Sequence, residues 1–182
     1  MFYSIIHNSK RLFDIHKHDD LDEANEYVRK EMPKFAKRGC AEDRSKSFQL
    51  YKNTDAIWHM FHDLPAGSSF WVDEGDHDMH GVIVHATKDM KWIYIHFGQF
   101  DGDGFPCDVQ FFKKRENAIK RKNIEYKKEL KECLEGQKED DKLMGVKNFR
   151  PLNHMEEDEC SAISWEDGCG GTVEVHLVME LI

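Results

Sequence analysis

Two strongly apolar runs flank a polar turn over residues 81–97, the only such pair in the sequence. Both runs are rich in β-branched and aromatic residues, so they predict a buried β-hairpin with its turn at residues 88–91. Successive side chains of a strand point to opposite faces. One face then carries only apolar side chains, namely Val82, Val84, Ala86, Ile93, Ile95 and Phe97. The other face carries Ile83, His85, Thr87, Trp92, Tyr94 and His96, and is expected to be either a functional site or a surface covered by a helix.

Patterns along the rest of the chain predict an α+β fold with a largely antiparallel sheet of about 7–8 strands. Helices are expected near residues 20–38, 54–64 and 113–135, where apolar residues recur at helical spacing. Asp20 and Glu23 form a capping box at the start of the first helix. The helices are expected to cover one face of the sheet.

The chain is predicted to form a single domain over residues 1–182. Gly136 is expected to end the third helix, and residues 137–168 are expected to form a charged, mobile excursion. From Thr172 a strict alternation predicts a final strand. Its inward residues are Val173, Val175, Leu177, Met179 and Leu181, and its outward residues are Thr172, Glu174, His176 and Glu180.

The composition is that of a globular protein, with 40% hydrophobic and 12% aromatic residues. No apolar run approaches the length of a membrane span, so we expect a soluble protein with no membrane partner. The five cysteines include no Cys-x-x-Cys pair, which argues against a disulfide framework or a zinc ribbon and favours a reducing cytoplasm. No motif for a cofactor occurs, and none is predicted.

Charge is distributed unevenly along the chain. Between Lys113 and Lys131 nine Lys or Arg residues stand against three Glu residues, whereas the whole chain carries a net charge of −9. Such a basic helix could bind nucleic acid through Lys120, Arg121 and Lys122. The favoured interpretation is a solvated helix whose basic groups pair with its own glutamates and with the acidic remainder of the chain.

The densest group of potential metal ligands lies in the loop before residue 81, at Asp76, His77, Asp78 and His80. Carboxylates and imidazoles are ligands for oxygen-preferring and borderline metals. Their spacing matches no standard metal motif, so a solvated acidic turn is the favoured interpretation and no metal is predicted.

Two short segments share a pattern at the end of an apolar strand. His7 is followed by Ser9, and His85 is followed by Thr87, so that each imidazole and hydroxyl point to the same side of their strand. This pattern resembles the signature of the two-histidine phosphoesterases. The resemblance implies metal-independent cleavage of phosphodiesters, with the two histidines as general acid and base and the hydroxyls as donors to the phosphate.

The absence of a recognisable active site favours a small acidic binding protein, an inhibitor or accessory factor, over an enzyme. In composition the chain is similar to small viral accessory proteins. A host or partner protein with a basic surface, such as a nucleic-acid-handling enzyme, would be attracted by the run Glu156, Glu157, Asp158 and Glu159. The nearby Trp165 would supply the aromatic anchor that interfaces favour.

Overall fold

The computed structural model describes residues 1–8, 11–39, 48–52, 69–73, 80–87, 89–100, 103–167 and 170–181. Its elements in chain order are β1 (Phe2–Asn8), β2 (Arg11–His18), α1 (Leu21–Gly39), β3 (Phe48–Lys52), β4 (Ser69–Asp73), β5 (His80–His85), β6 (Trp92–Phe100), β7 (Asp103–Phe112), α2 (Arg115–Met144), β8 (Leu152–Glu156), β9 (Cys160–Asp167) and β10 (Gly170–Glu180). The predicted α+β class is confirmed.

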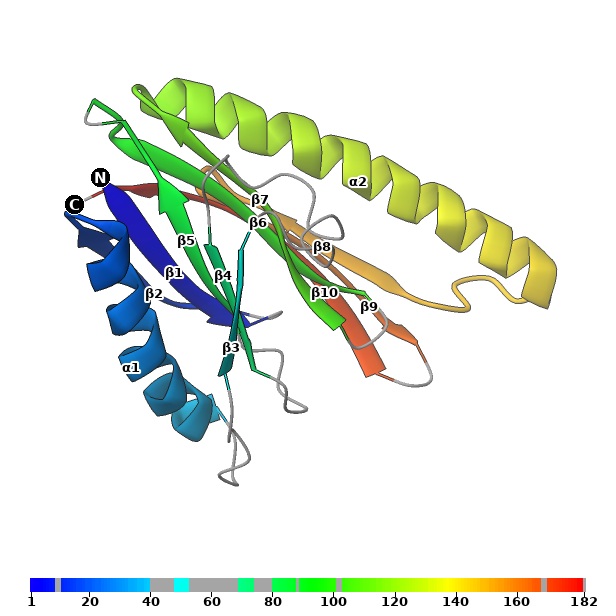
Figure 1. The fold of residues 1–182 in the computed structure, drawn as a ribbon. Coiled ribbons are helices and arrows are strands. Elements are labelled where there is room, and N and C mark those ends of the chain that lie inside the picture. Colours follow the sequence, from blue (N-terminus) through cyan, green and yellow to red (C-terminus); the bar gives the residue numbers. More distant parts are fainter. Residues whose placement is uncertain are drawn as a thin grey trace.

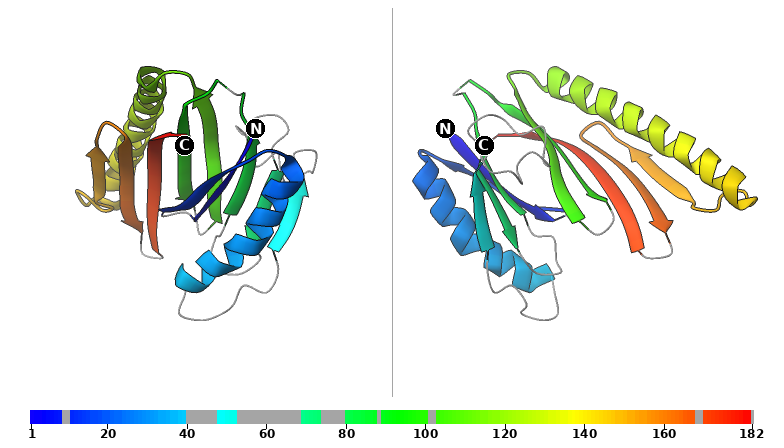
Figure 2. Two further views of the ribbon diagram at one scale, coloured as in Figure 1. Left: turned by 90° about the vertical axis from the view of Figure 1, so that its left-hand side faces the viewer. Right: turned by 45° about the vertical axis from the view of Figure 1, so that its right-hand side comes forward.

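The strands described form two antiparallel sheets rather than one. The first has the order β2-β1-β5-β4-β3, and the second has the order β7-β6-β10-β9-β8, which gives ten strands among the described residues. The two sheets lie face to face, with α1 on the outer side of the first and α2 on the outer side of the second (Figure 1). The chain therefore builds four layers in the order helix, sheet, sheet, helix, as the turned views also show (Figure 2).

Three apolar clusters hold these layers together. The central cluster lies between the sheets and includes Tyr3, Ile5, Val82, Ile95 and Val109. A second cluster packs Ala24, Val28 and Met32 of α1 on Ile6 and Ile83 of the first sheet. A third packs Ala118 of α2 on Tyr94 and Val178 of the second sheet. Each sheet is thus covered on both faces, which explains why β5 and β6 are so strongly apolar.

The region predicted to be a hairpin is divided between the two sheets. β5 pairs with β1 and β4, whereas β6 pairs with β7 and β10. The predicted alternation is right, because the described members of its apolar face, Val82, Val84, Ala86, Ile93 and Ile95, all lie in the central cluster. The predicted pairing is wrong. The opposite face of β5 is turned toward α1 and that of β6 toward α2, so His85 and His96 lie on opposite outer sides of the molecule.

The segment 137–168, predicted as an excursion, is largely regular structure. α2 continues through Gly136 and ends at Gly145, which adopts the left-handed conformation with φ 67°. The carboxylate of Asp141, near the end of α2, accepts hydrogen bonds from the backbone amides of Asn148 and Phe149, which follow the helix. The chain then returns as β8 and β9, which extend the second sheet under α2 (Figure 2).

The helix predicted near residues 20–38 corresponds to α1. Its capping box is present, since the amide of Glu23 donates to Asp20 Oδ1 and the amide of Asp19 donates to Glu23 Oε2. The helix predicted near 113–135 corresponds to α2, with its end moved to Met144. The helix predicted at 54–64 lies outside the described residues.

A buried lysine ties α2 to the β8–β9 hairpin. Lys122 is fully buried, and its ammonium donates to the backbone carbonyl of Glu157 and, at 2.7 Å, to Ser161 Oγ. Burial lowers the pKa of this ammonium. The contact fixes the turn of the hairpin against the helix.

We expect Lys122→Ala to lower the free energy of unfolding by about 2–4 kcal/mol, because it leaves the Ser161 hydroxyl and the Glu157 carbonyl without their donor and opens a cavity. Lys128→Ala, at an exposed position of the same helix, is the matched control and should change stability by less than about 0.5 kcal/mol. Urea unfolding followed by circular dichroism measures both values. Equal, small effects of the two variants would contradict the anchoring role.

Candidate functional site

The structure does not bring His7 and His85 together. In the antiparallel pair of β1 and β5, His7 is opposite His80 and His85 is opposite Phe2. Five residue steps along a strand correspond to about 17 Å. His7 is buried, whereas His85 is exposed on the outer face. A phosphate shared by these two imidazoles is therefore out of reach.

The other residues of that hypothesis give no support either, and most of the loop considered as a weak metal candidate is not described. Thr87 donates its hydroxyl proton to Asp89 Oδ1 at 2.9 Å, within its own turn. Ser9, Asp76, His77 and Asp78 lie outside the described residues, and for His80 only the backbone is described.

The predicted partner surface is not contiguous. In the β8–β9 hairpin Leu152 is opposite Trp165 and Glu156 is opposite Ser161, which places Trp165 at the far end from the acidic turn. Within the turn, Glu159 lies 3.0 Å from Arg115, and Glu156 lies 3.8 Å from Lys127. Asp158 is 3.9 Å from Arg115, and the backbone carbonyl of Glu157 accepts a hydrogen bond from the buried Lys122. The basic helix thus neutralises much of the acidic run.

The three residues considered for nucleic-acid binding do not share one exposed surface. Lys122 is buried, and Arg121 lies 3.0 Å from Asp108 and 2.7 Å from Glu125, which leaves Lys120 as the exposed member of the three. These ion pairs agree with the interpretation that the basic groups of this helix pair with its own glutamates and with the acidic remainder of the chain.

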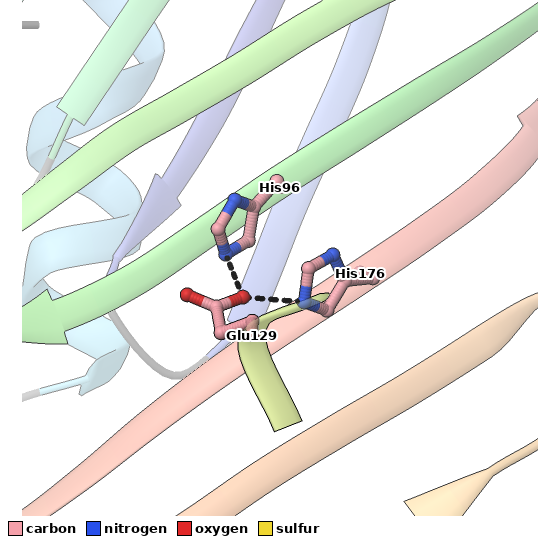
Figure 3. Close-up of side chains that lie close together, drawn as sticks. All are labelled: His96, Glu129 and His176. Carbon is pink, nitrogen blue, oxygen red and sulfur yellow. Dashed lines mark ion pairs between the residues drawn. The ribbon is translucent and has the colours of Figure 1, made fainter. Parts of the chain in front are cut away.

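A different polar group lies on the outer face of the second sheet, directly beneath α2. We call it the His–Glu cluster: His96 on β6, Glu174 and His176 on β10, and Glu129 on α2. His176 and Glu174 are almost completely buried, and His96 and Glu129 are 15% and 24% exposed at their side chains. In Figure 3 both imidazoles and the Glu129 carboxylate converge on one point.

The cluster is held by short contacts between imidazole nitrogens and carboxylate oxygens. Glu129 Oε2 lies 2.8 Å from His176 Nε2 and 3.3 Å from His96 Nε2, and Glu174 Oε2 lies 2.9 Å from His96 Nε2. The two imidazole rings are stacked, with centroids 4.1 Å apart. Register explains the stack, because His96 and His176 are directly opposite each other in the β6–β10 pair.

The surroundings give the members of the cluster different protonation states. Burial acts to lower the pKa of His96, but Glu129 and Glu174 outweigh it and raise the pKa to about 9. Burial acts to raise the pKa of Glu129, but the two imidazoles lower it to about 2. Burial lowers the pKa of His176 and raises that of Glu174. At neutral pH His96 is therefore a cation paired with the Glu129 carboxylate, and His176 is neutral.

Two tyrosines enclose His176. The Tyr94 hydroxyl lies 2.9 Å from His176 Nδ1, and the Tyr126 ring meets the imidazole edge-on at 5.8 Å between centroids. Both tyrosines are fully buried. The hydrogen bond at Nδ1 fixes the orientation of the ring, and Nε2 lies 2.8 Å from Glu129 Oε2 without a well-aligned hydrogen bond.

A pocket of about 320 Å³ opens beside the cluster, between α2 and the β8–β9 hairpin. We call it the Trp165 pocket. Its lining includes the carboxylates of Glu129, Glu132 and Asp140, together with Arg150, Leu152 and Trp165. Arg150 lies 3.5 Å from Asp140 and His96 pairs with Glu129, so Glu132 supplies the remaining negative charge of the pocket. Glu129 belongs both to the pocket and to the cluster.

Apolar side chains are exposed just beyond this pocket, where α2 ends. We call residues 143–149 the α2 tip. Leu143 is 82% exposed, Val146 53%, Met144 50% and Phe149 40%. The C-terminal end of α2 extends past the ends of the strands beneath it (Figures 1 and 2). Large apolar side chains gathered at a projecting end are typical of an interaction surface.

The sequence contained a partial signal for the cluster. Alternation assigned His96 to a mixed face that a helix could cover, and assigned Glu174 and His176 to the outward face of the final strand. The sequence does not show that β6 and β10 are neighbours, or that Glu129 contacts both imidazoles. The β6–β10 pairing joins residues at least 76 positions apart, and Glu129 is 33 and 47 positions from His96 and His176.

Comparison of the chain with family models, with curated proteins and with solved structures finds no match. Neither described helix has the length together with the apolar composition needed to cross a membrane.

The opposite pKa shifts of His96 and Glu129 define a pH window for their contribution to stability. The raised pKa of His96 stabilises the folded state fully below about pH 6.5, and this stabilisation is lost as the pH rises toward 9. The lowered pKa of Glu129 stabilises the folded state above about pH 4.5, and this stabilisation is lost as the pH falls toward 2. A double-mutant cycle with His96→Gln and Glu129→Gln should therefore give a coupling of about 1.5–3 kcal/mol at pH 5.5 and much less at pH 9.5.

The exposed pair of Lys131 and Glu135, 3.8 Å apart, is the control for this cycle. Its coupling should stay below about 0.5 kcal/mol at both pH values. A His96–Glu129 coupling that did not fall between pH 5.5 and 9.5 would contradict the assigned charge states.

Proposed function

We propose that this protein acts by association with another protein, which inserts a basic side chain into the Trp165 pocket and packs apolar side chains on the α2 tip. The observation that carries the proposal is the position of an acidic pocket with an aromatic wall directly beside a cluster of exposed apolar side chains. The proposal keeps the predicted partner with a basic surface. It replaces the run at 156–159 with the carboxylates of the pocket.

The charges of the pocket favour a cation. Three carboxylates line it. Arg150 offsets the charge of Asp140, and His96 offsets that of Glu129, which leaves the charge of Glu132. Glu132 is exposed and forms no ion pair among the described residues. The indole of Trp165 offers a surface over which a guanidinium or ammonium group is attracted. The volume is at the lower end of those found for ligand sites, which suits a single long side chain.

The α2 tip supplies apolar contact area, which the charged groups of the pocket do not provide. Electrostatic attraction mainly raises the rate of association, whereas affinity depends on a few well-packed anchors. Leu143 and Phe149 are large, exposed and close in sequence to the pocket residue Arg150. A partner segment that carries apolar residues beside its basic residue would cover both surfaces at once.

Selection of binders from a random displayed peptide library tests this proposal without knowledge of the natural partner. We expect the selected peptides to carry Arg or Lys next to apolar residues. Trp165→Ala should weaken their binding at least tenfold, since an aromatic anchor at the centre of an interface contributes about 2 kcal/mol or more. Glu132→Gln should weaken the binding of peptides that carry a basic residue and leave the binding of peptides without one unchanged.

Matched controls come from α2 itself. Leu143→Ser tests the tip, and Ile124→Ser, at an apolar side chain that is 52% exposed and distant in sequence, is its control. Glu116→Gln, at the exposed start of the helix, is the control for the charge change. Selected peptides that bind wild type, Trp165→Ala and Leu143→Ser equally well would contradict the proposed surface, as would the absence of any selected peptide.

A further inference from the structure

We infer that the His–Glu cluster is a binding site for a divalent transition-metal ion of the zinc class, with His96 Nε2, Glu129 Oε2 and His176 Nε2 as ligands. These three atoms lie within 4.8 Å of one another, and they are the one such group found among the described residues. The inference goes beyond protein association, because it assigns a bound ion to the outer face of the second sheet.

The separations of the ligand atoms suit a small ion. Zinc is bound at about 2.0–2.1 Å by nitrogen and oxygen ligands in a tetrahedral arrangement, which places neighbouring ligand atoms about 3.3 Å apart. Glu129 Oε2 is 2.8 Å from one imidazole nitrogen and 3.3 Å from the other. The two imidazole rings are within 8° of parallel, so at least one ring must turn about its side-chain bonds before both Nε2 atoms face one ion.

The imidazole of His176 is the strongest indication. It is fully buried, yet its Nε2 makes no aligned hydrogen bond, because the nearby Glu129 oxygen lies off the direction of the ring nitrogen. A buried polar nitrogen without a hydrogen bond is costly unless another ligand uses it. Its Nδ1 is held by the Tyr94 hydroxyl at 2.9 Å. A ligand histidine in a metal site is commonly oriented in this way through its second nitrogen.

The donor set selects the class of ion. Two imidazole nitrogens with one carboxylate suit zinc, cobalt and related ions, whereas magnesium and calcium prefer oxygen ligands only. Glu174, with Oε2 2.9 Å from His96 Nε2, is a nearby fourth donor. Glu129 also lines the Trp165 pocket, so an ion has a route from solvent to the site.

Metal titration of the full chain, expressed without a histidine tag and stripped with a chelator, tests this inference. We expect one Co²⁺ per chain, detected by the visible absorption of a four-coordinate site, and displacement of Co²⁺ by Zn²⁺ but not by Mg²⁺. His96→Gln and Glu129→Gln should each weaken binding at least about a hundredfold, since even the loss of an outer-shell partner of a metal ligand costs up to that amount. Zn²⁺ should also raise the unfolding temperature of wild type but not that of these two variants.

His85→Gln is the control, because it removes an exposed imidazole from the outer face of the other sheet. It should leave the affinity for Co²⁺ unchanged. The inference is overturned if wild type takes up no stoichiometric ion, or if binding is equal in wild type, His96→Gln and Glu129→Gln. Circular dichroism of each variant separates loss of a ligand from loss of the fold, and the wild-type titration decides the matter if a variant does not fold.

Discussion

The structure depends on the apolar layer between its two sheets. Tyr3 and Ile5 of β1 and Val82 and Val84 of β5 face Ile93, Ile95 and Val109 of the second sheet across this layer. Burial of large apolar side chains is the main favourable term in folding, and here it fixes which face of every strand points inward. The outer faces then need covers of their own, and α1 and α2 supply them. The polar cluster lies beneath one of these covers.

Local sequence patterns predicted many of the secondary-structure elements. They failed where contacts between residues distant in sequence determine the strand pairing. The alternation of β5, β6 and β10 and the capped start of α1 could be read from neighbouring residues. The pairing of β5 with β6 could not, because the connection at 86–91 passes between sheets instead of closing a hairpin. Gly136 carries the signal of a helix end, yet α2 continues over it to Gly145. The charge of the segment hid β8, whose exposed residues are mostly polar.

The candidate site was predictable only in part, for the same reason. His96 and His176 were assigned to outward faces, but they meet because β6 and β10 pair in register. Glu129 reaches both because α2 lies along those strands. The helix therefore has two surfaces with different chemistry. Its inner side closes a buried set of nitrogen and oxygen donors, and its C-terminal end presents the acidic Trp165 pocket and the α2 tip to solvent.

The central claim is that α2 and the second sheet build a metal site from His96, Glu129 and His176. Anomalous diffraction at the zinc absorption edge, from crystals grown with zinc, tests it most directly. We expect the strongest anomalous peak within bonding distance of both Nε2 atoms and of the Glu129 carboxylate. Diffraction that showed the imidazoles and the carboxylate in direct contact, with no anomalous peak between them, would contradict the account.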